Sequence, residues 1–176
     1  RILAATCRDH TREDYLRIIH RLREIFDGAS SEHVPAISTD LIVGFPGETD
    51  EDFEQTLDLM RRVRWDNAFM FKFSIRPGTA AATMPDQVDE EVKSRRLEQV
   101  IELQHRTGRQ INEQLIGQQV EVMLETPTGD SDWEGRSRQG RVVKATGAPS
   151  DAKPGDLLRV RVNDTTTYTL FGSAVP

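Results

Sequence analysis

The chain has little cysteine, and its histidines lack the spacing of metal ligands, which limits the disulfides and metal sites that it can form. Cys7 is the only cysteine among 176 residues, which excludes an internal disulfide and a multi-cysteine metal site formed by this chain alone. We interpret Cys7 as a spectator thiol. No two of the four histidines have metal-ligand spacing, so no metal site is predicted from His10, His20, His33 and His105.

Long apolar runs and a large charge excess are also lacking. No apolar run approaches the ~20 residues of a membrane-spanning helix, so no membrane partner is predicted. No secretory signal precedes the first expected helix, and the expected compartment is the cytoplasm. A net charge of -6 gives no general nucleic-acid signature. The chain opens on Arg1 rather than Met, so we expect it to be cut from a longer protein.

The most informative segment is residues 40–53, which predicts a strand, a tight turn and a capped helix. The apolar run 41–43 is typical of a parallel strand covered on both faces. Two glycines bracket a proline in the turn 44–47, and Thr49 is a plausible N-cap before acidic residues. Ligands bind at the carboxyl ends of strands in α/β folds, so function is predicted at this turn.

The rest of the first part continues the alternation of helix and strand. Apolar residues at helical spacing follow Thr11, Thr49 and Asp89, and an aromatic strand at 67–74 ends in a second punctuated turn at 76–79. This order is typical of a parallel α/β sheet. A sheet of only two strands would leave its edges unpaired, which proteins normally avoid. We therefore expect further strands from an absent part of the chain or from another copy.

Near Gly117 the pattern changes to short β-rich runs separated by Gly, Pro, Asp and Ser. Such runs predict a small antiparallel barrel, and they lie at residues 120–124, 141–145, 157–162 and 168–171. We place the boundary at 113–118, which gives two domains, 1–113 and 114–176. Loops with the patterns G-x-x-x-x-G-K-[ST] or G-x-G-x-x-G are absent, so a phosphate-binding α/β enzyme has no support.

With these segments identified, the chain resembles the carboxyl-terminal portion of the radical S-adenosylmethionine methylthiotransferases. The matching segments are residues 8–16, 39–49 (TDLIVGFPGET), 69–79 (FMFKFSIRPGT), 91–97 and 135–138. The third segment looks most like the branch that places a methylthio group on carbon 2 of an isopentenylated adenosine next to the tRNA anticodon. The resemblance implies the end of a TIM-like radical-SAM partial barrel, followed by a small OB-like TRAM barrel that holds tRNA.

The resemblance also implies cofactors that this chain cannot bind completely. The full-length enzymes use S-adenosylmethionine both as methyl donor and as radical source, and they hold two 4Fe-4S clusters. Both sets of cluster cysteines, one of them C-x-x-x-C-x-x-C, are absent here and belong to missing amino-terminal domains of the same protein. Because clusters need several thiolates, the chain alone is expected to be inert in radical chemistry.

Five residues are implied at the S-adenosylmethionine site: Ile42, Val43, Gly44, Ser74 and Arg76. The first three would line the adenine, and the last two end the neighbouring strand, where a guanidinium could grip a carboxylate or phosphate. The alternative for residues 42–44 is a buried core strand followed by a tight turn. The alternative for Arg76 is a salt bridge to Glu48. Glu48 itself is interpreted as a turn or cap residue rather than a base.

Four cations within nine residues are implied at the RNA: Arg136, Arg138, Arg141 and Lys144. Residues 114–176 contain seven basic and eight acidic side chains in all, so the excess of positive charge is confined to this cluster and is not a general property of the domain. Its alternative is a solvated hairpin face. Trp133 could stack on a base or cover the barrel end as a loop residue. Gly140 replaces the family's usual Asn, which argues against an amide-to-base contact there.

Two other functions stay open at this point. In the first, the chain comes from a member of the same family that modifies threonylcarbamoyl-adenosine in tRNA or a ribosomal protein instead. Alternatively, the chain is an RNA-binding module in which the α/β part is only a scaffold. The tRNA affinity of the isolated chain at several salt concentrations distinguishes a module from a fragment.

Overall fold

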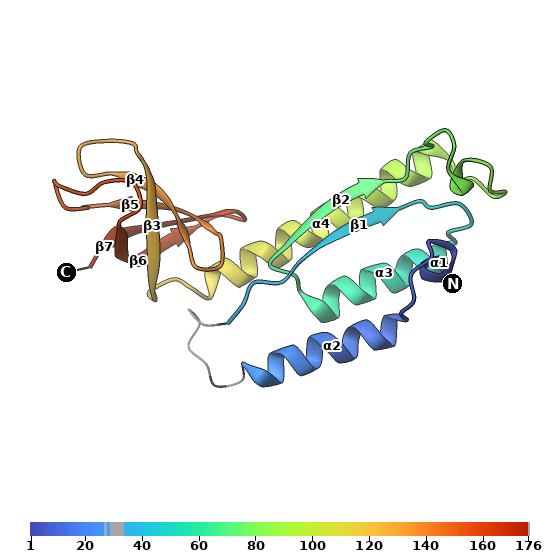
Figure 1. Cartoon of the computed structure of the whole chain (residues 1–176), viewed down its shortest axis with the longest axis horizontal. Helices are drawn as coiled ribbons and strands as arrows, with labels where there is room; N and C mark the ends of the chain where they lie inside the picture. Colours follow the sequence, from blue (N-terminus) through green and yellow to red (C-terminus); the bar gives the residue numbers. More distant parts are fainter. Residues whose placement is uncertain (27, 29–33, 176) are drawn as a thin grey trace. The chain divides into compact units, whose positions relative to one another are not determined.

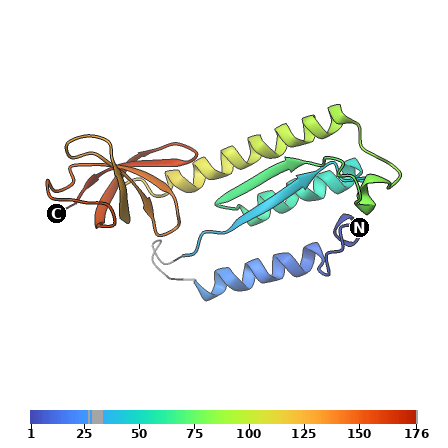
Figure 2. The ribbon, with the colours of Figure 1, turned by 45° about the horizontal axis from the view of Figure 1, so that its top comes forward.

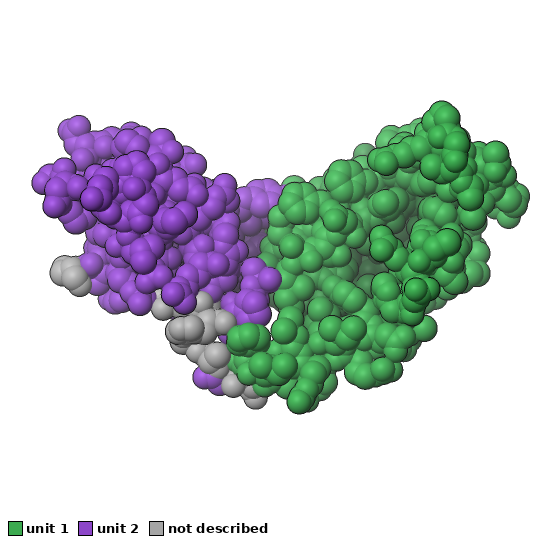
Figure 3. Space-filling model, in the orientation of Figure 1, with its two compact units in different colours: residues 1–27, 37–105 green, residues 28–36, 106–176 purple. Residues whose placement is uncertain are grey.

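The computed structural model describes residues 1–26, 28 and 34–175 of the chain. The chain divides into two compact units, one of residues 1–27 and 37–105 and the other of residues 28–36 and 106–176 (Figure 3). Each unit has its own hydrophobic core. The two are described separately below.

The first unit alternates helices and strands, as the sequence predicts. Its elements are α1 (Ile2–Ala5), α2 (Arg12–Ile25), β1 (Ser38–Val43), α3 (Asp50–Val63), β2 (Asn67–Lys72), the 3-10 turn η1 (Ala80–Ala82) and the first part of α4 (Glu90–Glu113). The sequence also predicts that the first long helix, α2, ends in residues 28–32, and all of these except Gly28 lie outside the described residues.

Helices α2 and α3 both begin at a threonine cap, as predicted for Thr49. The Thr11 and Thr49 hydroxyls each accept the main-chain N–H three residues later, and Asp14 and Asp52 accept the N–H of the cap in return. The Thr11 main-chain N–H, with the Thr11 hydroxyl, lowers the pKa of Asp14. These local bonds fix where α2 and α3 begin, and α3 begins directly after the turn that follows β1.

Strands β1 and β2 run parallel, in register from Ser38 opposite Asn67 to Val43 opposite Lys72 (Figure 1). Within the described residues they form a two-stranded sheet. One face of this sheet packs against α3 and α4, which lie beside it in both views (Figures 1 and 2). The shared core contains Val43, Phe53, Leu57, Met60, Val63, Trp65, Ala68 and Val100.

The other face of the sheet is exposed, with Ile42 56% accessible next to Phe69 and Phe71. The expectation that the 41–43 strand is covered on both faces is therefore wrong for this chain. Successive side chains of a strand point to opposite faces, so only Leu41 and Val43 reach the core. The apolar run in the sequence thus belongs to a strand with one bare face.

The second unit contains a closed five-stranded barrel, which confirms the predicted OB-like fold class. Its strands are β3 (Gln119–Pro127), β4 (Trp133–Ser137), β5 (Val142–Thr146), β6 (Leu157–Thr165) and β7 (Thr169–Ala174). They close in the order β3-β4-β5-β7-β6, with β5 and β7 parallel and the other pairs antiparallel.

Strand β4 was not predicted, and it changes the interpretation of Trp133. Trp133 is only 6% exposed and packs in the barrel core with Val122, Leu124 and Leu170. Both sequence interpretations, a base-stacking residue and a loop residue over the barrel end, are wrong. Gly135 faces inward on the same strand, where an added Cβ would overlap the main-chain oxygen of Met123.

The helices of the described residues include none that combines the length and the hydrophobicity required to cross a membrane.

Candidate functional site

The carboxyl ends of β1 and β2 lie at the same edge of the sheet. The Phe73 N–H donates to the Val43 carbonyl oxygen at 2.8 Å, so the pairing continues one residue beyond β2. Gly44 and Ser74 therefore follow two neighbouring parallel strands at one edge. This is the edge where open α/β sheets bind their ligands.

The turn after β1 depends on its first glycine. Gly44 has φ +74°, a left-handed conformation that favours glycine, and an added Cβ would overlap the side chain of Lys93. The Gly44 N–H donates to Glu48 Oε1 at 2.9 Å, and the Glu48 N–H donates to the Phe45 oxygen at 2.9 Å. Glu48 thus closes the turn with its own carboxylate, as its interpretation as a turn residue requires.

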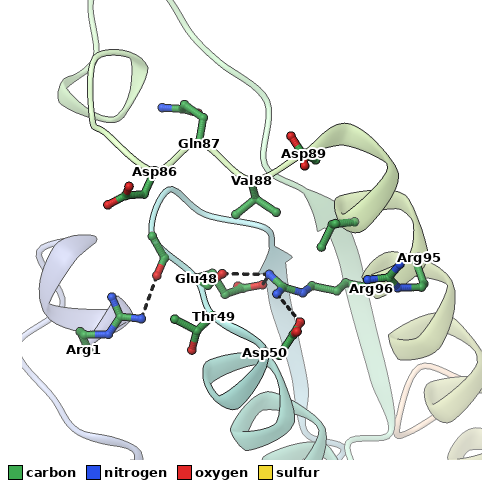
Figure 4. Close-up of a pocket in the computed structure, with 12 residues that line it drawn as sticks. Arg1, Glu48, Thr49, Asp50, Asp86, Gln87, Val88, Asp89, Arg95 and Arg96 are labelled. Carbon is green, nitrogen blue, oxygen red and sulfur yellow. Dashed lines mark hydrogen bonds and ion pairs between the residues drawn. The ribbon is translucent and has the colours of Figure 1, made fainter.

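Arg96 of α4 holds the same turn from the other side (Figure 4). Its Nη1 lies 2.8 Å from Glu48 Oε1 and 3.1 Å from the Glu48 main-chain oxygen, and its Nη2 lies 2.8 Å from Asp50 Oδ1. The side chains of Arg96 and Glu48 are only 5% and 4% exposed. The guanidinium also lies 5.4 Å from the centre of the Phe53 ring.

The pKa values of two carboxyl groups in this site are shifted in opposite directions. Burial raises the pKa of Glu48, and the Gly44 N–H and the Arg96 guanidinium offset part of that effect. A hydrogen bond from Arg96 lowers the pKa of the exposed Asp50. Arg96 is thus shared between one buried and one exposed carboxylate, and it ties the end of the turn to the start of α3.

The alternative in which Arg76 forms a salt bridge to Glu48 is wrong, because Glu48 pairs with Arg96. Ser74 and Arg76 are both exposed beyond the end of β2. Among the residues that the structure describes, Arg76 forms no ion pair. Its guanidinium is therefore available to a ligand at this edge.

Lys93 supports the ends of both strands from α4. It is buried against Gly44, and its Nζ lies 5.5 Å from the centre of the Phe73 ring and 3.6 Å from a Glu90 oxygen. Glu90 also pairs with Lys72 at the end of β2. The first turns of α4 therefore hold both strand ends through buried or paired charges.

Sequence reasoning missed Lys93 and Arg96 as parts of the site. Both lie on the stripe of α4 that also carries the buried Val100, at spacings of three and four residues. A cation at a core position of a helix indicates a buried acidic partner elsewhere in the chain. For Arg96 this partner is Glu48, whereas Lys93 pairs with the exposed Glu90 of its own helix.

The five residues implied at the cofactor are placed unequally. Ile42 exposes its side chain beside Phe71, and Gly44 begins the turn. Val43 is 1% exposed and faces the core, so it can reach a ligand only through its main chain. No cluster of three or more potential metal-binding side chains occurs among the described residues.

A cavity of about 500 Å³ lies beside the turn, between it and the segment that leads into α4 (Figure 4). Its lining mixes both signs of charge, from Asp50, Asp86, Asp89, Arg95 and Arg96 among others. Arg1 crosses it, donating to the Gly47 oxygen at 2.8 Å and pairing with Asp52. The cavity shares Glu48 and Arg96 with the turn and so belongs to the same site.

In the barrel, the four predicted cations lie around the β4–β5 hairpin. Arg136 and Lys144 are exposed on β4 and β5, and Arg138 is exposed in the turn between them. Arg136 lies 3.4 Å from Glu125, and Arg138 lies 2.9 Å from Glu121. Both acidic partners belong to β3.

Arg141 differs from the other three cations. It is half-buried, and its Nε donates to Asn112 Oδ1 at 2.9 Å. Asn112 in turn donates to the main-chain oxygens of Thr166 and Thr167. Arg141 thus has a structural contact inside its own unit, in addition to any role on the surface.

Gly140 completes the hairpin turn with φ +75°. Its N–H donates to the Ser137 oxygen at 2.8 Å, and the Ser137 N–H donates to the Arg141 oxygen at 2.9 Å. Glycine and asparagine are the two residues that most readily adopt this left-handed conformation. The glycine therefore keeps the turn that the family's usual Asn would form.

Comparison with known proteins agrees with this architecture. The family model of the Radical SAM superfamily matches residues 1–60. Proteins named tRNA-2-methylthio-N(6)-dimethylallyladenosine synthase are similar over 99% of this chain, with 42% identity in Acetivibrio thermocellus, 45% in Moorella thermoacetica and 46% in Chlorobium limicola. The chain belongs to the radical S-adenosylmethionine methylthiotransferase family. It spans 35% to 38% of the length of these relatives.

Membership of the methylthiotransferase family accounts for two features of this chain. The single cysteine of the chain, Cys7, is exposed, and one thiolate cannot ligate an iron–sulfur cluster by itself. Within the described part of the chain, β1 and β2 pair only with each other and leave one face bare, which is consistent with part of a barrel.

Proposed function

We propose that this chain is the carboxyl-terminal part of a tRNA methylthiotransferase that acts in the cytoplasm on isopentenylated adenosine near the anticodon. The complete enzyme places a methylthio group on carbon 2 of that base. It uses S-adenosylmethionine and two 4Fe-4S clusters whose ligands lie outside this chain. The observation that carries the proposal is the similarity to synthases of this name over 99% of the chain.

Residues 1–113 contribute one wall of the S-adenosylmethionine site. The strand ends fit a nucleoside, because Ile42 offers an exposed apolar side chain and Gly44 a turn without side-chain bulk. Ser74 and Arg76 provide a hydroxyl and a guanidinium at the same edge. Val43 takes part through its main chain. Lys93 and Arg96 keep these groups in position from α4.

Residues 114–176 hold the tRNA. OB-like barrels bind oligonucleotides on the face formed by their second and third strands, which here are β4 and β5. Arg136, Arg138 and Lys144 are exposed there or in the connecting turn, and the half-buried Arg141 lies directly before β5. Contacts from such cations to phosphates give affinity that is independent of sequence and sensitive to salt.

The proposed activity is tested in cells that lack their own synthase, with the full-length protein that contains this chain. Mass spectrometry of tRNA nucleosides should show a 2-methylthio group on isopentenylated adenosine. A methylthio group on threonylcarbamoyl-adenosine or on a ribosomal protein instead would assign the chain to another branch of the family. Unmodified tRNA and protein would leave the RNA-binding module as the better account.

The proposed cofactor wall has its own test, in the same full-length protein. Arg76→Gln should weaken S-adenosylmethionine binding by about 10- to 100-fold in equilibrium dialysis, because a charge-assisted hydrogen bond contributes about 1.5–3 kcal/mol. Arg62→Gln, an exposed arginine on α3, is the matched control and should bind as the wild type does. Equal binding by both variants would remove Arg76 from the site.

A further inference from the structure

Two of the cations proposed to hold RNA already have anionic partners on the barrel surface. Arg136 from β4 pairs with Glu125, and Arg138 from the following turn pairs with Glu121. Both glutamates extend from the outward side of β3, where burial alternates along the strand. Glu125 is the extra residue of β3 at a register shift, between the residues paired with Gly135 and Glu134 of β4.

Neither pair is needed to hold the barrel together. The side chains are 51% and 37% exposed in the Arg136–Glu125 pair, and 56% and 22% exposed in the Arg138–Glu121 pair. The barrel is closed by main-chain pairing and by an apolar core on the opposite side of these strands. Exposed pairs contribute little to stability, so their partners can be exchanged at small cost.

A carboxylate and a phosphate present similar oxygen pairs to a guanidinium. The donor atoms of Arg136 and Arg138 that now face Glu125 and Glu121 are therefore the ones that a phosphate would use. Each arginine faces its glutamate through Nε, so a phosphate that takes paired hydrogen bonds from Nε and the adjacent Nη must displace the carboxylate. The displaced carboxylates then lie close to the phosphates and repel them.

We infer that Glu121 and Glu125 are specificity-determining residues that compete with RNA phosphates for Arg138 and Arg136. This inference rests on the proposed RNA role of the barrel. The competition lowers the affinity for any nucleic acid that reaches only one arginine, and it favours a folded RNA that brings phosphates to both. It also keeps an acidic chain with a small basic cluster from binding nucleic acids in general.

Salt dependence gives the inference a second signature. Binding to phosphates releases counterions, which steepens the fall of affinity with salt by roughly 0.7–0.9 per phosphate on logarithmic axes. A carboxylate set free from its arginine recruits cations and cancels part of this release. Removing the carboxylate should therefore tighten binding most at low salt and make the salt dependence steeper.

The experiment titrates this chain into a fluorescently labelled, unmodified tRNA transcript and follows anisotropy at several KCl concentrations. Glu121→Gln and Glu125→Gln should each tighten binding about threefold at the lowest salt, and the double variant about tenfold. The affinities should converge with the wild type as salt increases. Asp151→Asn removes the same charge from an exposed site on the barrel and should change affinity much less.

Three results separate this inference from the RNA role itself. Unchanged or weaker binding by both glutamine variants would overturn the inference, because the glutamates would then be inert or would position the arginines. An Asp151→Asn gain as large as theirs would also overturn it, since net charge alone would be responsible. If Arg136→Gln and Arg138→Gln bind as tightly as the wild type, the proposed RNA face fails, and the inference with it.

Discussion

In the first unit the Glu48–Arg96 pair is almost entirely buried, whereas in the barrel the Arg138–Glu121 pair leaves more than half of the arginine exposed. The buried pair connects a helix to a turn 48 residues away and is surrounded by further hydrogen bonds. The exposed pair connects β3 to the turn that follows β4, in a barrel that is already closed. Burial makes the first pair a fixed part of the fold, and exposure leaves the second open to exchange with a ligand.

The difference corresponds to what each unit is proposed to bind. A nucleoside wall needs a turn held in one conformation, since its contacts involve the main chain and small side chains. A phosphate-binding surface needs cations that can leave one anion for another. The same kinds of residue therefore serve two purposes, and solvent access separates them.

The largest expected effect comes from removing the buried cation. Arg96→Met leaves Glu48 buried without its partner and should destabilise the first unit by about 3–5 kcal/mol. The chain has two tryptophans, with Trp65 buried in this unit and Trp133 in the barrel, so a Trp133→Phe background reports on the first unit alone. Denaturant unfolding followed by Trp65 fluorescence measures the change.

Arg95→Gln is the control for this change, because Arg95 is exposed next to Arg96 and carries the same charge. It should alter stability by no more than about 0.5 kcal/mol. Similar losses for both variants would mean that net charge, rather than the buried pair, matters for the first unit.

A second prediction concerns the close packing of β3 against β4 in the barrel. Gly135→Ala places a methyl group against the Met123 carbonyl and should destabilise the barrel by about 1–3 kcal/mol, read by Trp133 in a Trp65→Phe background. Gly140→Asn on the same hairpin keeps the left-handed turn and should be neutral within about 0.5 kcal/mol. A neutral Gly135→Ala would show that β3 and β4 can move apart.

Local features of the first unit could be predicted from sequence because their causes are local. The Thr49–Asp52 capping box spans three residues, and the helix–strand alternation follows from periodicity. The Glu48–Arg96 pair could not be placed in this way, since its members lie far apart in the chain. The exposure of Ile42 depends on what covers the sheet, which its own strand does not encode.

In the barrel, strand β4 was missed for a similar reason. Its sequence, Trp-Glu-Gly-Arg-Ser, has no β-branched residue and contains a glycine, so propensity does not favour a strand. Closure of the barrel supplies what propensity does not, by pairing β4 on both edges. The burial of Trp133 follows from that closure. The cluster of four cations around Trp133 could be predicted, because its members are close together in the sequence.

The smallest expected effect is a pH dependence that differs between buried and exposed carboxyl groups. Burial raises the pKa of Glu48 above its ordinary 4.5, so the wild type loses stability relative to Glu48→Gln as pH rises from about 4.5 through the raised value. The stability gap between the two proteins should narrow over that range. Unfolding experiments at successive pH values measure it.

Asp14→Asn should show the opposite trend. The Thr11 hydrogen bonds lower the pKa of Asp14 below 3.8, so its contribution is present above 3.8 and is lost as pH falls through the lowered value. The gap between wild type and Asp14→Asn should therefore widen as pH rises. The same trend in both variants would contradict the assignment of burial as the cause at Glu48.

The contrast between the two units is tested most directly by a pair of double-mutant cycles in one chain, one for Glu48 with Arg96 and one for Glu121 with Arg138. Trp65 in the Trp133→Phe background reports the first cycle, and Trp133 in the Trp65→Phe background reports the second. We expect a coupling free energy of about 2–3 kcal/mol for the buried pair and no more than about 0.5 kcal/mol for the exposed pair. Equal coupling in the two cycles would contradict the account, because solvent access would then not distinguish a fixed contact from an exchangeable one.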